Sequence, residues 1–225
     1  MRGRAPELAR RRRCPDCHLH RSLCLCALVP RLATRTRVVL VMHELELRKP
    51  TNTGRLAARC LENSAVVVRG AGAPADLSPA WREAPTPLLL YPDPDAQPLE
   101  RWRDWPTPVT LVVPDGTWRQ AARARRRISG VADLPCVSLG QTAPTANLLR
   151  RPVRPGRLST LEALARALGV LEGPDVEGPL LHILRVMVDR MLWSHGGLTD
   201  AEVTGGIPAG VLPHDPLSGA ARGPE

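Results

Sequence analysis

Apolar and polar positions along the chain fall into two kinds of pattern, short β-branched runs and segments with helical spacing. The apolar runs predict strands at 37–42, 65–68, 88–91 and 109–113, and residues 135–139 form a candidate fifth strand. The run at 109–113 is β-branched and unbroken, which is typical of a strand buried on both faces.

Four segments between and after these runs are predicted to be helical. One begins at an Asn52 cap and extends to about residue 63, and a second covers about 117–128. A third begins at the Ser159 capping box and ends at Gly169, and the last extends from Pro179 to Gly196. Because strands alternate with helices, the predicted fold class is α/β with a mostly parallel sheet.

A chain of 225 residues suits one domain of ordinary size with appendages. We expect a basic flexible N-terminus at 1–13, a cysteine module at 14–36 and a main domain at 37–196. The Gly/Pro-rich stretch at 197–225 lacks periodicity and is predicted to be disordered. No apolar run reaches membrane-spanning length and no signal-peptide core follows the first arginines, so we expect a cytoplasmic protein.

The net charge of +9 and the pI near 10.4 favour an anionic partner such as nucleic acid. Lys49 is the only lysine, and the excess of Ala, Arg, Pro and Gly is typical of a GC-rich genome, so clustering says more than total charge. Arginines cluster at 10–13, 119–127 and 150–157. Each cluster is either part of a phosphate-binding surface or a solvated helix face.

Four of the six cysteines lie in the pattern C-x2-C-x6-C-x-C, formed by Cys14, Cys17, Cys24 and Cys26. Paired cysteines on a short loop are typical of a zinc site, and four thiolates leave no open coordination position, so the metal is expected to be structural. Disulfide pairing is the alternative, which a reducing compartment disfavours. Cys60 and Cys136 fall on apolar faces and are expected to be core residues.

The segment Asp115-Gly116-Thr117-Trp118 comes directly after the most buried predicted strand. Ligands of open α/β sheets bind at the carboxyl ends of strands. Asp115 or Thr117 caps the following helix; Asp115 is a general-base candidate only if a substrate proton comes within reach. Trp118 either packs in the core or offers a stacking surface, and Gly116 permits close backbone approach to a ligand. The residues alone indicate an α/β protein with a zinc module and an RNA-binding surface.

Four blocks in order resemble the DTW-domain family, the tRNA-uridine aminocarboxypropyltransferases. They are CPDCHLHRSLCLC at 14–26, HELELRKPTNTGRLA at 43–57, DGTW at 115–118 and LLRRPVRPGRLSTLEALA at 148–165. The resemblance implies transfer of the 3-amino-3-carboxypropyl group of S-adenosylmethionine to N3 of a tRNA uridine, with release of methylthioadenosine. It also implies a core related to the knotted SPOUT methyltransferases.

The same resemblance, together with the chemistry of these side chains, assigns roles to residues. Asp115 and Trp118 are the catalytic candidates, with Asp115 positioning or deprotonating the uracil. The expected S-adenosylmethionine contacts are Asn52, Thr53, Gly54, Gly116, Thr117, Ser159, Thr160 and Glu162. Amides at the helix starts near Thr160 and Asn52 are candidate donors to the carboxylate of the transferred group. The proposed tRNA phosphate contacts are Arg119, Arg123, Arg150 and Arg151.

Two other functions fit these residues. One is an RNA methyltransferase that uses the same cofactor, which differs only in the carbon that the enzyme presents to the nucleophile. The other is a non-catalytic zinc-ribbon RNA-binding protein, which would bind tRNA without affinity for S-adenosylmethionine.

Overall fold

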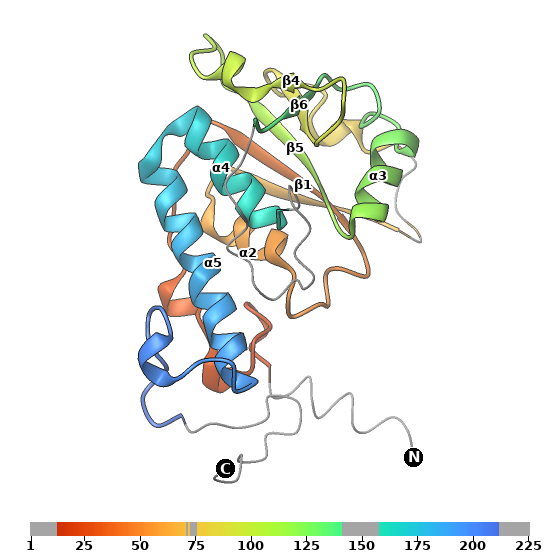
Figure 1. The fold of residues 1–225 in the computed structure, drawn as a ribbon. Helices are drawn as coiled ribbons and strands as arrows, with labels where there is room; N and C mark the ends of the chain where they lie inside the picture. The colour runs from red at the N-terminus through yellow and green to blue at the C-terminus, as the bar shows by residue number, and fades with distance from the viewer. Residues whose placement is uncertain (1–12, 71, 73–75, 141–157, 212–225) are drawn as a thin grey trace.

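The computed structural model describes residues 13–70, 72, 76–140 and 158–211 (Figure 1). Within them, six strands form one sheet in the order β2-β1-β5-β3-β6-β4, with every neighbouring pair parallel. The strands are β1 (Arg37–His43), β2 (Ser64–Arg69), β3 (Pro87–Leu90), β4 (Gln97–Pro98), β5 (Thr110–Asp115) and β6 (Cys136–Ser138). The predicted α/β class and the five predicted strands are confirmed; β4 was missed because two residues carry no pattern.

Four α-helices accompany the sheet in the described part of the chain: α2 (Thr53–Cys60), α3 (Trp118–Arg127), α4 (Thr160–Glu172) and α5 (Pro174–Ser194). Short 3-10 turns lie at η1 (Arg21–Leu23), η2 (Cys26–Leu28), η3 (Ser78–Ala80), η4 (Leu99–Trp102) and η5 (Asp200–Glu202). Figure 1 shows α2, α4 and α5 grouped together, with α3 away from them at the far end of β5. None of the described helices has the length and apolar character needed to cross a bilayer.

Alternation along the strands builds a separate core on each face of the sheet. In β1, Val38 and Leu40 pack in the cluster that holds α2, α4 and α5. Their neighbours Val39 and Val41 face the other side, where Trp81 and other loop residues cover the sheet. The central strands are therefore apolar on both faces, as their unbroken β-branched pattern predicts.

The boundary between the last two helices differs from the prediction. Gly169 lies inside α4, which continues to Glu172; a Cβ on this glycine would come within 2.4 Å of a Glu177 carboxylate oxygen, so the glycine permits close packing. The break falls at Gly173, whose φ of 100° suits glycine, and Pro174 takes the first position of α5. Pro179 is thus inside α5 rather than at its start.

The predicted disorder beyond Gly197 is wrong for residues 197–211. Val203 is buried in a small cluster with Leu23 and Trp193. The backbone of this segment also accepts from Arg190, through the Gly206 carbonyl at 3.2 Å. These turns have no periodic apolar pattern, so no local signal predicts their packing. Residues 212–225 and 1–12 lie outside the described residues.

Candidate active site and cysteine cluster

Asp115, the last residue of the central strand β5, is 2% exposed and lies between the starts of two helices. Its Oδ2 accepts from Asn52 Nδ2 at 2.6 Å, and its Oδ1 accepts from the hydroxyl of Thr160. Asn52 precedes α2 and Thr160 begins α4. One carboxylate therefore fastens both helix starts to the end of the central strand, where helix dipoles favour a negative charge.

Side chains at these two helix starts also accept hydrogen bonds from backbone amides of the same or the other helix. Asn52 Oδ1 accepts from Arg55 N at 2.7 Å, and Ser159 Oγ accepts from Glu162 N at 3.3 Å. Thr53 Oγ1 accepts from Leu161 N at 3.4 Å, which joins α2 directly to α4. The expected caps at Asn52 and Ser159 are confirmed, and these amides are already bonded to protein side chains.

Thr117, rather than Asp115, caps α3. Its hydroxyl accepts from Gln120 N at 3.3 Å, and Gln120 Oε1 accepts from Thr117 N at 2.7 Å, which completes a capping box. The alternative left open by the sequence is thus resolved: Asp115 binds across to α2 and α4.

Two glycines allow this close packing. A Cβ on Gly54 would lie 2.7 Å from the Asp115 carboxylate, so the first turn of α2 can approach the strand only without a side chain. Gly116 has a φ of +152°, and a Cβ there would lie 2.7 Å from Gln120 Oε1. At both positions of the predicted site, the surrounding atoms leave no room for a side chain larger than that of glycine.

An apolar cavity of about 510 Å³ opens at the carboxyl ends of β3, β5 and β6. Its walls are mostly aliphatic, with Tyr91, Ser138 and the α4 start supplying polar groups. The lining residues are Leu90, Tyr91, Pro92, Val113, Pro114, Gly116, Trp118, Ala121, Ser138, Leu139, Gly140, Leu158, Ser159, Thr160 and Ala163. Such a cavity, apolar with a few polar groups at strand ends, is typical of small-molecule sites in α/β proteins.

A second cavity, of about 490 Å³, adjoins the same segment and is polar. It is lined by Glu46, Lys49, Thr51, Asn52, Asp115, Gly116, Thr117, Trp118 and Arg119. Gly116 and Trp118 line both cavities, so the DGTW segment forms the wall between them. The sequence analysis missed Glu46, Lys49 and Tyr91, although Glu46 and Lys49 follow the predicted strand 37–42 and Tyr91 ends the predicted strand 88–91, which was a usable signal.

Some of the predicted site residues line the apolar cavity, some line the polar cavity and some line neither. Gly116, Trp118, Ser159 and Thr160 line the apolar cavity, and Asn52, Asp115, Thr117 and Arg119 line the polar one. Thr53 and Gly54 stand behind them, holding α2 against α4 and Asp115. Glu162 lines neither cavity: it is fully buried and bonds Arg166 at 3.2 Å. Arg150 and Arg151 lie outside the described residues.

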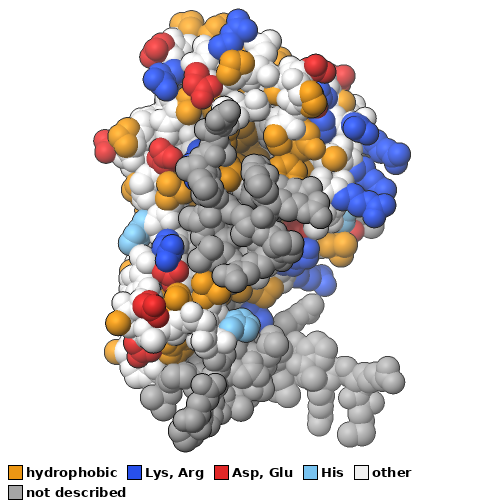
Figure 2. All heavy atoms as spheres, in the orientation of Figure 1, with side chains coloured by type: hydrophobic (Ala, Val, Ile, Leu, Met, Phe, Trp, Pro, Cys, Tyr) orange, Lys and Arg blue, Asp and Glu red, His pale blue; other side chains and the backbone are white. Residues whose placement is uncertain are grey.

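Arginines form a stripe along the exposed side of α3. Arg119, Arg123, Arg126 and Arg127 are all exposed, at spacings that place them on neighbouring turns. Arg125 instead turns inward and donates to the Ala132 carbonyl at 2.9 Å. Figure 2 shows basic side chains gathered on the side of the molecule where Figure 1 places α3. The stripe begins at the polar cavity, because Arg119 also lines it.

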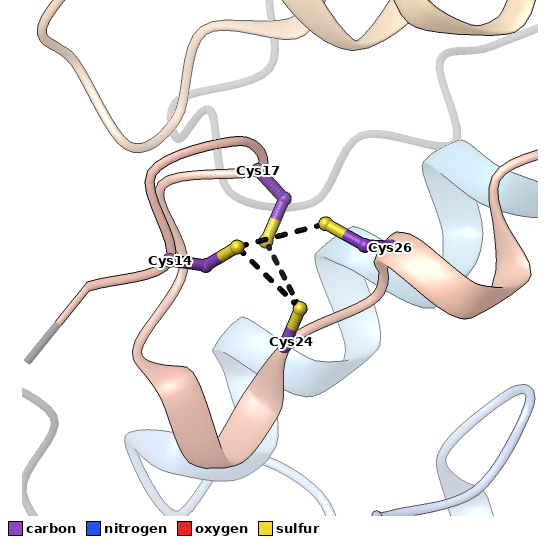
Figure 3. Close-up of side chains that lie close together, drawn as sticks. All are labelled: Cys14, Cys17, Cys24 and Cys26. Carbon is purple, nitrogen blue, oxygen red and sulfur yellow. Dashed lines mark hydrogen bonds between the residues drawn. The ribbon is translucent and has the colours of Figure 1, made fainter.

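The four clustered cysteines bring their sulfurs together (Figure 3). Cys14 Sγ lies 3.6 Å from both Cys26 Sγ and Cys24 Sγ, and Cys17 Sγ lies 3.9 Å from Cys24 Sγ. A tetrahedral zinc ion with bonds of about 2.3 Å needs sulfurs about 3.8 Å apart. A disulfide would bring two sulfurs to about 2.05 Å. The residues fit a four-thiolate zinc site, and all six cysteines are free thiols.

Arginines surround this cysteine cluster. Arg59 Nη1 donates to Cys26 Sγ at 3.2 Å, Arg55 Nη2 to the Cys17 carbonyl at 3.3 Å, and Arg190 Nη1 to the Cys24 carbonyl at 2.6 Å. A divalent ion with four thiolates carries two net negative charges, which neighbouring guanidinium groups offset. The cluster is thereby tied to α2 and α5.

The thiols of the cluster differ in how readily they ionise. Burial raises the pKa of Cys17 to about 12. Burial also raises the pKa of Cys14, but hydrogen bonds with the Cys17 and Asp16 backbone outweigh it and bring that pKa down to about 7. A metal cation provides the positive charge that a cluster of four thiolates needs.

Comparison with known proteins gives a consistent result. The model of the DTW domain family matches residues 11–192. A protein named tRNA-uridine aminocarboxypropyltransferase 2 from Drosophila melanogaster is 32% identical over 192 residues, covering 81% of this chain and 76% of the relative. The protein of the same name from Macaca fascicularis is 30% identical, and the match covers 83% of this chain and 65% of the relative. A protein named tRNA-uridine aminocarboxypropyltransferase A from Arabidopsis thaliana is 26% identical, with 80% of each chain covered. No solved structure was found to match.

Substituting Gly54 tests the packing around Asp115. We expect Gly54→Ala to lower the free energy of unfolding by about 1–3 kcal/mol, because its methyl group displaces the carboxylate. Urea unfolding measures the change. Gly178→Ala is the matched control: its Cβ meets nothing within 4 Å in α5, so alanine there is expected to be neutral or stabilising. A Gly54→Ala protein as stable as the wild type would contradict the tight contact.

Substituting Cys24 tests the zinc site. We expect Cys24→Ser to weaken zinc binding more than about 100-fold. Even the loss of a residue that only hydrogen-bonds to a metal ligand typically lowers metal affinity about 10- to 100-fold. Metal analysis of the purified protein and competition with a chromophoric chelator measure the effect. Cys136→Ser, which replaces a thiol outside the cluster, is expected to retain one zinc per chain; equal zinc contents in the two variants would exclude the site.

Proposed function

The chain belongs to the DTW-domain family, and on that premise we propose that it is a tRNA-uridine aminocarboxypropyltransferase. It transfers the 3-amino-3-carboxypropyl group of S-adenosylmethionine to N3 of a uridine in tRNA and releases methylthioadenosine. The observation that carries this proposal is the pair of unlike cavities meeting at the DGTW segment. A donor with an adenosyl end and a charged amino-acid end needs two such environments.

The apolar cavity suits the adenosyl end of the donor. Its volume of about 510 Å³ is within the usual range for small-molecule sites. Trp118 and Tyr91 offer flat apolar surfaces for an adenine ring, and Ser138 and Ser159 offer hydroxyl groups for its polar edge or the ribose. In this arrangement the sulfonium lies toward the wall that the two cavities share.

Orientation of the donor decides the product. Each of the three carbons on a sulfonium is electrophilic, so the enzyme must present the aminocarboxypropyl methylene, rather than the methyl group, to the uracil. N3 of the uracil loses its proton to solvent as the N3–C bond forms, and the C–S bond breaks to release a neutral thioether. Fixed side chains around the DGTW segment orient S-adenosylmethionine and so select the carbon that reacts.

Asp115 serves the reaction by holding the site together. Its oxygens accept from Asn52 and Thr160, and only 2% of the residue is exposed, which favours positioning over proton abstraction from a bulky nucleotide. Ser159 and Thr160 at the start of α4 and Thr117 at the start of α3 then keep fixed places in the two cavity walls. General-base catalysis by Asp115 stays a hypothesis that these contacts disfavour.

The tRNA approaches along α3. The exposed side chains of Arg119, Arg123, Arg126 and Arg127 form a row of guanidinium groups suited to successive phosphates, and the row leads to the polar cavity. Arg150 and Arg151, outside the described residues, are proposed as further phosphate contacts.

The zinc ion is proposed to be structural, because Cys14, Cys17, Cys24 and Cys26 leave it no open position for a substrate. Thiols of this kind suit a reducing compartment such as the cytoplasm. A core related to the knotted SPOUT methyltransferases remains a proposal, supported by the all-parallel sheet and by cavities at its carboxyl edge.

Mass analysis of modified tRNA tests the reaction. Unmodified tRNA incubated with the protein and S-adenosylmethionine is expected to gain about 101 Da on a uridine, the mass of the aminocarboxypropyl group, rather than about 14 Da for a methyl group. A methyl adduct would establish the methyltransferase alternative. Binding of tRNA without measurable binding of S-adenosylmethionine would establish the non-catalytic one.

Neutralising the stripe tests the path of the tRNA. Arg123→Gln combined with Arg126→Gln is expected to weaken tRNA binding and to reduce the slope of log K against log salt by about two, one for each lost phosphate contact. Arg103→Gln, at an exposed arginine that directly follows η4, is the matched control. Filter binding across a salt series measures both; an unchanged slope in the double variant would place the tRNA elsewhere.

A further inference from the structure

The polar cavity holds opposite charges in a confined space. Glu46 is 6% exposed, and its Oε1 accepts from Lys49 Nζ at 2.5 Å. Arg119 adds a second cation to the lining, and Asp115 adds a second carboxylate. Burying a carboxylate is costly unless a cation accompanies it. A ligand that carries charges of both signs would therefore find a partner for each of them here.

Lys49 stands out within the composition of the chain. It is the only lysine among 31 lysine and arginine residues, and it lies in this cavity. An ammonium is a compact point charge with three donors, whereas a guanidinium is a broad planar fork. Glu46 occupies one of those donors, and 46% of the Lys49 side chain remains exposed. Lys49 thus has donor capacity toward a ligand in the cavity.

Three backbone amides of the neighbouring helix starts are poor alternatives for binding an anionic group. Arg55 N, Leu161 N and Glu162 N already donate to protein side chains. These three candidate donors, which lie near Thr160 and Asn52, are in this way occupied. Side-chain cations, Lys49 and Arg119, are in turn available to a carboxylate in the polar cavity.

We propose that the polar cavity binds the zwitterionic amino-acid end of S-adenosylmethionine, with Lys49 pairing with its carboxylate and Glu46 with its ammonium. This inference rests on the proposed function and assigns its donor-binding subsite. A uracil ring is uncharged and calls for no pair of opposite full charges, whereas an α-amino acid carries both. The donor then spans the DGTW wall, with its two ends in the two cavities that Gly116 and Trp118 line in common.

The subsite is tested by comparing two ligands that differ in the amino-acid end. Calorimetric titration of the full-length, zinc-containing protein uses S-adenosylmethionine and methylthioadenosine, which keeps the adenosyl end and the methylthio group but lacks the amino-acid end and the sulfonium charge. Lys49→Met, which keeps the chain length and removes the charge, is expected to weaken S-adenosylmethionine binding roughly 10- to 100-fold, as for lost hydrogen bonds to charged groups. Its binding of methylthioadenosine is expected to stay within about twofold of the wild type. Glu46→Gln is expected to show the same selectivity.

Control variants distinguish the loss of the Lys49 charge from a general disturbance of the fold. Lys49→Arg restores the positive charge and is expected to recover part of the lost affinity. Arg82→Met removes a cation paired with Asp76 at 3.0 Å outside both cavities, and is expected to change neither titration. Thermal unfolding of each variant checks that the fold is intact; Glu46→Gln and Lys49→Arg carry the comparison if Lys49→Met unfolds.

The outcomes distinguish this inference from the function on which it rests. Equal weakening of both ligands in Lys49→Met, or no weakening of either, would overturn the subsite while leaving the transferase intact. A wild-type protein that binds methylthioadenosine and S-adenosylmethionine equally tightly would also overturn it. A wild-type protein that binds neither ligand would overturn the proposed function as well.

Discussion

The structure of the site depends on one buried carboxylate. Asp115 ends the central strand, and its two oxygens hold Asn52 before α2 and Thr160 at the start of α4. Gly54 leaves the space that this contact needs. Because the carboxylate is buried and bonded on both sides, it fixes where the two helices begin relative to the strand. The positions of Ser159, Thr160 and Asn52 in the cavity walls follow from that contact.

The helix α2 connects the candidate active site to the cysteine cluster. Asn52 at its start binds Asp115, Arg55 in its first turn donates to the Cys17 carbonyl, and Arg59 donates to Cys26 Sγ. Cys14 and Cys17 are also part of the large core cluster that contains α4 and α5. The cysteine module is thus packed into the main domain, and a structural metal bound there would stabilise the helix whose start carries the Asp115 contact.

Elements with a strong local pattern were predictable. The strands β1 and β5 contain unbroken apolar runs, and the caps at Asn52, Thr117 and Ser159 use side chains that accept from amides three residues further along the chain. The break between α4 and α5 was predicted at the wrong glycine. Gly169 permits close contact with Glu177, and it does not mark the end of the helix. Val203 was missed for a similar reason: its burial depends on Leu23, far away in the chain.

The sequence by itself determined the α/β pattern, the spacing of the four cysteines and the position of the DGTW segment after a buried strand, because each depends on neighbours in the chain. Only the tertiary structure decided what Asp115 does, since its partners lie 63 and 45 residues away. It alone brought Glu46 and Lys49 to the wall that Trp118 shares between two cavities. Neighbouring parallel strands end at one edge of the sheet, and that shared edge gathers residues that no local pattern relates.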